Sequence, residues 1–444
     1  MEDSLNETKR EDRLNMTNAK SFIYKKLYKL AVKLKPMAVK LFSFETRQKI
    51  KKRLLKTAFP IHKNGTSENN KGVLTGVNLV GYSRAEMGIG ESCRIAAKSM
   101  NAVEIPFGII NFTGTNSARM NDNTWVHKEM SGPEYNLNVF HINAEQMIEI
   151  YAHYGNSIFK DRYNIGFWHW ELPDFPDDWK ESFNLVDEIW APSTFVVDSI
   201  GMKSPVPVVK IPHSIEVSIT DVRDRSYFNL PEQTFLFLSM YDLKSYQARK
   251  NPQASIKAFQ LAFPPDDESV GLVIKVNSVE RDSKELNELH ELIGNYNNIF
   301  LIDRTLSRND TNALISVIDS YVSLHRSEGF GLGLAEAMYL GKPVIGTNWS
   351  SNVDFMDYNN SCLVDYRLVQ LDHDHGPYKS YQYWADPDVK HASQYMRKLS
   401  DDKNFYEEVS FKGEEHIKKN YSPQAIGELI KKRLEYISLW KFGG

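Results

Sequence analysis

Cysteine is scarce in this chain, and long apolar runs are missing. Among the 444 residues there are only two cysteines, Cys93 and Cys362, and they form no C-x-x-C pattern. Neither a disulfide framework nor a thiolate metal site is therefore indicated, and a reducing cytoplasm is the expected location. No stretch of about 18 consecutive apolar residues occurs, so a membrane-spanning helix is not expected. The first residues show no signal-peptide pattern either.

Two common nucleotide-binding glycine motifs are missing as well. The glycine pairs at positions 88 and 90 and at positions 331 and 333 lack the third glycine of a dinucleotide fingerprint, because Cys93 and Glu336 stand there. No G-x-x-x-x-G-K-[S/T] sequence occurs, since Gly341-Lys342 is followed by a proline. A dinucleotide-binding loop and a P-loop are therefore both excluded.

The net charge of −3 conceals a basic N-terminal arm joined to an acidic remainder. Residues 20–56 hold eleven lysines and two arginines against Glu45 alone, so their charge of +12 leaves −15 for the rest of the chain. Apolar residues recur there with a helical period, and Pro36 separates two predicted helices. Such a basic amphipathic helix pair favours the surface of an anionic membrane. A solvated arm, a helix docked on the body and a nucleic-acid arm are the alternatives, although no nucleic-acid-binding motif occurs and no such partner is expected.

The rest of the chain alternates between strand and helix patterns, which predicts doubly wound α/β domains with parallel sheets. We expect a polar tail, the basic arm and a linker in residues 1–71, followed by α/β domains in residues 72–212 and 213–424. Residues 425–444 form a final helix. The predicted strands include 77–81, 105–112, 138–142, 164–170, 188–191 and 206–211 in the first domain, and 234–240, 270–276, 299–302, 321–324 and 344–347 in the second.

The most informative segment is residues 320–348, which reads as a strand, a glycine-rich turn, a helix and a second strand. Glu328 lies in the turn and Glu336 in the first turns of the helix. The glycines between them allow a ligand to approach the backbone, and the helix start favours a phosphate. A carboxylate on each side of such an anion site suits hydroxyl groups, so one acid could hold a sugar ring and the other a ribose.

This segment, Glu328-Gly-Phe-Gly-Leu-Gly-Leu-Ala-Glu336, resembles the E-x7-E signature of retaining glycosyltransferases with the GT-B fold, in particular glycosyltransferase family 4. The resemblance covers roughly residues 73–440 and is most specific over 234–356. It implies two Rossmann-like domains that face each other across a cleft, with the acceptor mainly on the first domain and the nucleotide sugar on the second. The final helix is expected to cross back to the first domain. It also implies that Glu328 orients the donor sugar and Glu336 holds the ribose. The diphosphate is expected on the backbone of Phe330, Gly331, Leu332 and Gly333, with the loop of Gly88 and Gly90 approaching the ligand.

The cations of the donor site depart from the family pattern. After the strand at 234–240 the family usually has Gly-Arg and later Lys, but Tyr241-Asp242 stand here in place of Gly-Arg. Lys250 corresponds to the family lysine, and Arg249 is the candidate for the arginine, with Lys244 behind it. Two cations before a helix start oppose the helix dipole, so an anion is expected nearby. The family contacts the nucleotide base at the positions of Arg304 and Thr305.

Candidate residues of the first domain follow its strands. His169 lies where the family often has a histidine that faces the donor sugar, and a packed core histidine is the equal alternative. Glu171 and His141 share this ambiguity. Trp168 and Trp170 could stack on a sugar, but core packing is the better prediction for them.

No metal site is predicted. His373 and His375 are expected in an irregular surface insertion without further ligand spacing. Family members need no bound metal, because the helix dipole and the cations neutralise the leaving diphosphate.

The resemblance implies a retaining transferase that moves a sugar from a nucleotide diphosphate sugar, of the UDP or GDP type, to a saccharide acceptor without a cofactor. With the basic arm, it suggests a lipid-linked acceptor at the cytoplasmic face of the plasma membrane. The product would belong to a bacterial surface polysaccharide, namely O-antigen of lipopolysaccharide, capsule or exopolysaccharide, with partner glycosyltransferases possible. The alternative is a catalytically weak GT-B scaffold in an assembly complex, which the change at Tyr241-Asp242 leaves open. A sugar phosphorylase of the same fold is disfavoured, since nothing resembles its cofactor-binding lysine context.

Overall fold

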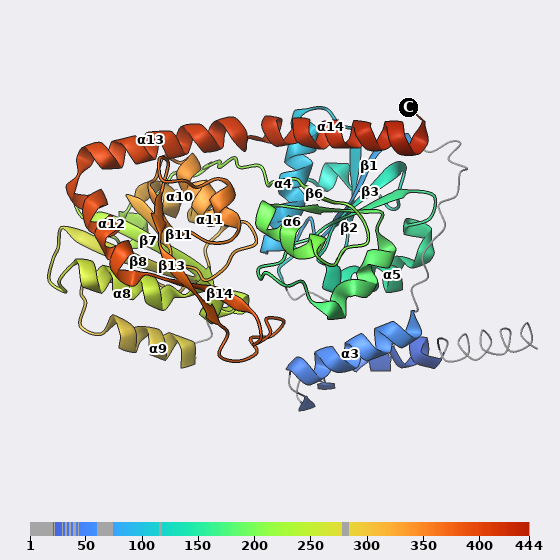
Figure 1. Ribbon diagram of the computed structural model, residues 1–444, viewed down its shortest axis with the longest axis horizontal. Helices are drawn as coiled ribbons and strands as arrows, with labels where there is room; N and C mark the ends of the chain where they lie inside the picture. The colour runs from blue at the N-terminus through green and yellow to red at the C-terminus, as the bar shows by residue number, and fades with distance from the viewer. Residues whose placement is uncertain are drawn as a thin grey trace, which may run out of the picture.

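The computed structural model describes residues 21–59 except positions 22, 29, 32, 35–36, 39–40 and 43, and residues 74–114, 118–277 and 284–443. Two α/β halves lie side by side, and two long C-terminal helices run along one edge of both (Figure 1). The predicted architecture of two Rossmann-like sheets with a basic helical arm is confirmed.

The first half is built on a six-stranded parallel sheet in the order β2-β1-β3-β4-β5-β6. Its strands are almost continuously buried, as expected for a parallel sheet with helices on both faces. The elements are β1 Leu74–Gly81, α4 Gly88–Ala102, β2 Phe107–Asn111, β3 Tyr135–His141, α5 Met147–Tyr154, β4 Tyr163–Phe167, β5 Glu188–Ala191, α6 Thr194–Gly201 and β6 Val208–Lys210.

The second half has a six-stranded parallel sheet in the order β12-β11-β10-β7-β8-β9. The strand order reverses between β7 and β10, and ligands of open α/β sheets bind at the carboxyl ends of the strands at such a point. The loops after β7 and β10 therefore mark the expected site. The elements are β7 Phe235–Asp242, α7 Gln247–Lys250, α8 Pro252–Ala262, β8 Val270–Asn277, α9 Lys284–Ile293, β9 Ile299–Ile302, α10 Arg308–Val317, β10 Ser320–Ser323, α11 Leu332–Tyr339, β11 Val344–Thr347, β12 Cys362–Val364, α12 Val389–Asp401, α13 Lys403–Asn420 and α14 Pro423–Phe442.

Two predicted boundaries in the first half are wrong. The strand predicted over 164–170 ends at Phe167, because the backbone N–H of His169 donates to the Asn143 side chain instead of continuing the ladder. The helix predicted from residue 92 already begins at Gly88, so Gly88 and Gly90 lie in its first turn and not in a loop. A Cβ at Gly90 would lie 2.2 Å from the carbonyl oxygen of Ala85. Packing of the helix start on its own preceding loop therefore requires glycine at position 90.

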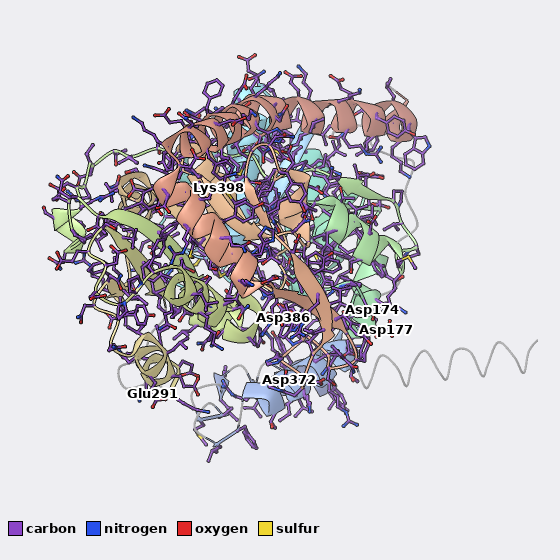
Figure 2. The ribbon with its side chains drawn as sticks, turned by 60° about the vertical axis from the view of Figure 1, so that its left-hand side comes forward. Asp174, Asp177, Glu291, Asp372, Asp386 and Lys398 are labelled. Atoms are coloured by element: carbon purple, nitrogen blue, oxygen red, sulfur yellow. The ribbon has the colours of Figure 1, made fainter. Side chains whose placement is uncertain are left out.

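The insertion predicted to be irregular contains an antiparallel hairpin, β13 Tyr366–Gln370 and β14 Tyr383–Pro387. Its tip reaches the first half. Tyr381 donates to Asp174 at 2.5 Å, and the backbone N–H of Asp174 donates to Gln382 at 3.0 Å. Figure 2 labels Asp174 and Asp177 beside this hairpin. The hairpin thus holds the two halves together, and the core cluster of the first half includes its buried residues Leu371, Tyr378 and Trp384.

The basic arm is docked on the first half through α3, Phe44–Ala58, which lies next to α5 (Figure 1). Three lysines of α3 form ion pairs with the body, and Leu55 and Ala58 are buried. One alternative for the arm was a helix docked on the body, and α3 is such a helix. None of the described helices is long and apolar enough to span a membrane. The ion pairs are Lys51 with Glu149 at 2.6 Å, Lys52 with Asp178 at 2.7 Å and Lys56 with Glu181 at 2.7 Å.

The last helix, α14, packs on α4 and is fixed to the first sheet by a buried ion pair. Glu188 of β5 is 0% exposed, and its carboxylate accepts from Nε of Arg433 at 2.9 Å. Trp190 and Tyr163 donate to the same carboxylate at 2.7 and 3.1 Å. Arg433 thus compensates the charge of a carboxylate that is buried inside the protein.

We predict that Arg433→Met lowers the free energy of unfolding by roughly 3 to 5 kcal/mol, because a buried carboxylate loses its counter-ion. Urea denaturation followed by fluorescence measures this change. Lys432→Met removes an exposed lysine one position earlier and serves as the matched control. Adding Glu188→Gln to Arg433→Met should restore part of the loss. An unchanged denaturation midpoint in Arg433→Met would show that the ion pair does not hold α14 to the sheet.

Candidate active site

The turn between β10 and α11 depends on two glycines. Gly331 has a φ of +98°, a conformation that favours glycine, and it caps α11. A Cβ at Gly333 would lie 2.6 Å from the hydroxyl oxygen of Tyr321. The first N–H groups of α11 have no acceptor within their own helix, so the turn presents donors at the positive end of the helix dipole.

Glu328, in this turn, is paired with both cations predicted for the donor site. Lys250 Nζ lies 2.5 Å from Glu328 Oε1, and Arg249 Nη1 lies 3.4 Å from Oε2. Glu328 and Arg249 are only 8% and 4% exposed. Burial alone would raise the pKa of Glu328, but Lys250 and Arg249 lower this pKa to about 2. Glu328 is therefore ionised at neutral pH.

Arg249 connects this turn to the first half of the molecule. Its Nη1 donates to the carbonyl oxygen of Ser327 at 2.8 Å, and its Nη2 lies 4.0 Å from Glu171 Oε1. The other carboxylate oxygen of Glu171 accepts from the hydroxyl of Tyr378 at 3.0 Å. Nε of Arg249 is buried and has no hydrogen-bond partner among the described residues. The cluster therefore has a donor in place for a further acceptor.

His169 lies against the same turn from the first half. A Cβ at Gly329 would lie 3.8 Å from the Cβ of His169. The two ring nitrogens of His169 contact Asn143 Oδ1 at 3.3 Å and His213 Nε2 at 2.9 Å. Burial lowers the pKa of His169 to about 4, so the ring is neutral at pH 7. The predicted contact of His169 with a donor sugar stays a prediction, and it would require these hydrogen bonds to rearrange.

Glu336, predicted to hold the ribose, is 5% exposed in α11. Both of its carboxylate oxygens contact the guanidinium of Arg308, the first residue of α10. Glu336 is the fifth residue of α11, a little more than one turn from Gly331, on the same element as the predicted phosphate site. The second acid of the signature is thus also paired with a cation.

The remaining predicted residues of the first half lie apart from this cluster or in the core. His141 is 1% exposed and contacts Ser92 Oγ at 3.0 Å. Trp168 and Trp170 are core residues, as predicted. Gly90 is used in packing, whereas a Cβ at Gly88 would meet no atom within 4 Å.

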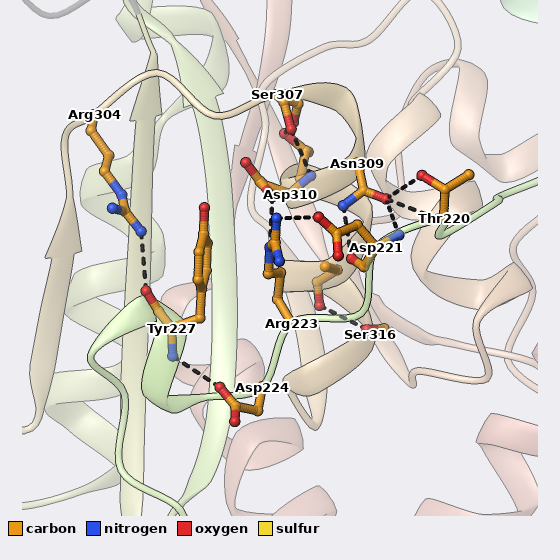
Figure 3. A network of polar contacts seen from close by, with 12 residues as sticks. Thr220, Asp221, Arg223, Asp224, Tyr227, Arg304, Ser307, Asn309, Asp310 and Ser316 are labelled. Atoms are coloured by element: carbon orange, nitrogen blue, oxygen red, sulfur yellow. Dashed lines mark hydrogen bonds and ion pairs between the residues drawn. The ribbon is translucent and has the colours of Figure 1, made fainter.

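The residues predicted to contact the base are exposed, and Arg304 contacts the segment between the two sheets. Its Nη2 donates to the carbonyl oxygen of Tyr227 at 3.2 Å, and its guanidinium lies 5.4 Å from the Tyr227 ring centre (Figure 3). Thr305 is exposed beside it. Phe330 is buried in the core, so only its backbone remains for a phosphate. The side chain of Lys244 lies outside the described part of the structure.

Among the described residues, one group could surround a metal ion, namely Asp372, His373 and His375 on the loop of the hairpin. The carboxylate of Asp372 already contacts both imidazoles, at 3.0 Å for His373 Nδ1 and 2.8 Å for His375 Nε2. His375 also packs on Trp384, with ring centres 5.3 Å apart. The group lies on the hairpin loop and includes no residue of the Glu328 cluster.

Three residues of the site were not identified from the sequence: Arg308, His213 and Tyr378. Arg308 and Tyr378 pair with acids that are 28 and 207 positions away. His213 lies just beyond the carboxyl end of β6, and this position after a parallel strand was the only sequence signal for it. The long separations explain why motif spacing missed them.

Comparison with known proteins bears on the fold and on the second half. Residues 223–362 match the model of the family described as glycosyl transferases group 1. No curated protein sequence matches the chain significantly.

Solved structures match over most of the chain at low identity. Anabaena HepE in complex with UDP and glucose has 14% identity and a TM-score of 0.57, covering 81% of this chain and 100% of that one. A glycosyltransferase from Rickettsia africae has 13% identity and a TM-score of 0.59, covering 82% and 98%. Sucrose-phosphate synthase from Thermosynechococcus elongatus has 11% identity and a TM-score of 0.58, covering 82% and 99%. These likenesses confirm the predicted GT-B fold for this chain.

Proposed function

We propose that the protein is a retaining glycosyltransferase of the family 4 type, which transfers a sugar from a UDP or GDP sugar to a saccharide acceptor. The observation that carries the proposal is the pairing of Glu328 with Lys250 and Arg249 beside the Gly331 turn. It lies where the strand order of the second sheet reverses. The match of residues 223–362 to glycosyl transferases group 1 and the UDP complex of HepE support the donor class.

The charges of this cluster suit a leaving diphosphate. Breaking the bond to the anomeric carbon leaves negative charge on the phosphate, and preorganised cations and N–H groups stabilise that charge. Lys250, Arg249 with its unpartnered Nε, and the start of α11 supply them. No metal step is needed for this stabilisation, so we propose a metal-independent reaction.

Retention at the anomeric carbon is proposed from the protonation state of Glu328. An inverting transferase needs a general base whose pKa lies near the working pH. With its pKa held at about 2 by two cations, Glu328 is a poor base at pH 7. A role in orienting the sugar suits it better, with the leaving phosphate itself accepting the proton of the incoming hydroxyl.

A screen of sugar nucleotides tests the proposed activity. Release of UDP or GDP should be detected with one or a few donors and should disappear in Lys250→Ala. Lys257→Ala, at an exposed lysine of α8, is the matched control and should keep the wild-type rate. Absence of nucleotide release with every donor and acceptor would favour the scaffold alternative over the enzyme.

We predict that Glu328→Gln lowers the turnover number by roughly a hundredfold or more, the scale on which preorganised groups act in transition states. Nucleotide affinity should not fall, because the loss of the carboxylate frees Lys250 and Arg249 for the diphosphate. Steady-state kinetics and calorimetric titration with UDP measure the two effects separately. A Gln variant with the wild-type turnover number would remove Glu328 from the mechanism.

We further propose that the arm attaches the enzyme to the anionic cytoplasmic face of the plasma membrane, where a lipid-linked acceptor would be found. Eight of its large apolar residues are between 43% and 69% exposed, and Lys25, Lys26 and Lys33 are exposed too. Exposed apolar residues interspersed with exposed lysines suit an anionic lipid interface. The exposed apolar residues are Ile23, Leu27, Leu30, Leu34, Met37, Leu41, Phe42 and Ile50. A role in surface polysaccharide synthesis with partner transferases would follow from this location.

We predict that the triple variant Leu27→Ser, Leu34→Ser and Leu41→Ser reduces co-sedimentation with vesicles that contain anionic lipid, since apolar burial is lost. Binding of the wild type should also fall as salt rises, because charges are screened beyond about 8 Å at physiological ionic strength.

The control for this prediction is the pair Leu439→Ser and Trp440→Ser, at exposed apolar positions of α14. Because the triple variant keeps the ion pairs of α3, its rate on a short soluble acceptor should be unchanged. Equal sedimentation of the triple variant and the wild type would assign the arm to a protein partner instead.

A further inference from the structure

Arg308 lies between Glu336, which is proposed to hold the ribose, and Glu91 of the first half. Its guanidinium contacts both oxygens of Glu336, with Nη1 at 3.5 Å from Oε2 and a closer contact from Nη2 to Oε1. The Arg308 side chain is 47% exposed, whereas that of Glu336 is 7% exposed. The guanidinium therefore lies between a buried carboxylate and the solvent.

The same guanidinium reaches the first half of the molecule. Nη2 of Arg308 lies 3.8 Å from Oε1 of Glu91, in the first turn of α4. Glu91 is itself held by Arg94, whose Nε donates to it at 3.1 Å. The carbonyl oxygens of Ser83 and Ala85 each accept from Arg94 at 2.9 Å. Arg308 is thus fixed from both halves, although it comes from the second.

We propose that Arg308 is a positioning residue that holds Glu336 in the orientation required to bind the ribose diol of the donor. The inference rests on the proposed function, because it presupposes a nucleotide donor. An ionised carboxylate offers about four acceptor sites, and a bidentate arginine occupies two of them. The two that remain match the vicinal 2′ and 3′ hydroxyls of a ribose. Arg308 also compensates the charge of this buried carboxylate, which can then accept from both hydroxyls.

The planar fork of arginine is what this role needs. A lysine at position 308 could neutralise Glu336, but it offers a single ammonium and cannot fix the plane of the carboxylate. The contact from Glu91 restrains the side of the guanidinium that faces the first half. Recognition of the ribose in the second half therefore depends on α4 of the first half as well.

The test compares UDP with 2′,3′-dideoxy-UDP, both titrated calorimetrically into the full chain. The wild type should prefer UDP. Arg308→Met should lower the affinity for UDP roughly tenfold, the scale of a charge-assisted hydrogen bond, and change the affinity for the dideoxy nucleotide little. The preference for ribose should then disappear, and Arg308→Lys should restore only part of it.

Arg223→Met is the matched control. Arg223 also contacts the start of α10, through Asp310 at 3.4 Å, but it does not contact Glu336 (Figure 3). This variant should keep the wild-type preference for UDP.

Three results would overturn the inference while leaving the proposed function intact. Arg308→Met could keep the ribose preference, lose affinity equally for both nucleotides, or bind UDP more tightly. The first would separate Arg308 from the ribose, the second would indicate a general effect of charge, and the third would make Arg308 an obstruction. A wild type that binds neither of these nucleotides nor GDP would refute the proposed function itself.

Discussion

The ion pairs of Glu328 with Lys250 and Arg249 connect the loops after β7 and β10, and the candidate site depends on them. Glu328 and Arg249 are both buried, and an uncompensated buried charge costs several kcal/mol, so each depends on a partner of opposite charge. The carboxylate positions the cations, and the cations keep the carboxylate ionised. A diphosphate that binds here would therefore compete with Glu328 for Lys250 and Arg249.

The first half contributes to the same cluster through residues that are distant in sequence. Glu171 and the hairpin residue Tyr378 are in contact although 207 positions separate them. Ser327, next to Glu328, donates to the carbonyl oxygen of Glu171. The half predicted to bind the donor and the half predicted to bind the acceptor are thus joined by direct hydrogen bonds. Any opening between the halves would have to break these contacts together with those of Arg308.

The sequence allowed the parts of the fold and site that depend on local spacing to be predicted. The strand, glycine turn and helix around Glu328 and Glu336 were predicted correctly because they follow one another directly in the sequence. Glycine at every second position from 329 to 333 marks the turn. The start of α4 at Gly88 was missed because Gly88 and Gly90 read as loop residues, whereas Gly90 is a helical residue that packs closely on Ala85. The hairpin was missed because β13 is largely exposed and shows no buried face.

Contacts that depend on the placement of distant charges could not be predicted. Docking of α3 uses three acids of the first half that form no motif in the sequence. Net charge identified the arm, but it could not show that Lys51, Lys52 and Lys56 pair with acids of the body. The pairing of Arg308 with Glu336 is of the same kind, since a lone arginine before a helix carries no signal.

The central claim is that the Glu328 cluster and the Gly331 turn bind a nucleotide diphosphate. A crystal structure of the protein with UDP tests this most directly. We expect the ribose on Glu336, the β-phosphate on the backbone N–H groups of Leu332 and Gly333, and Lys250 Nζ moved from Glu328 toward the phosphate. UDP bound at any other place, or Lys250 still paired with Glu328 and without a phosphate contact, would contradict the account.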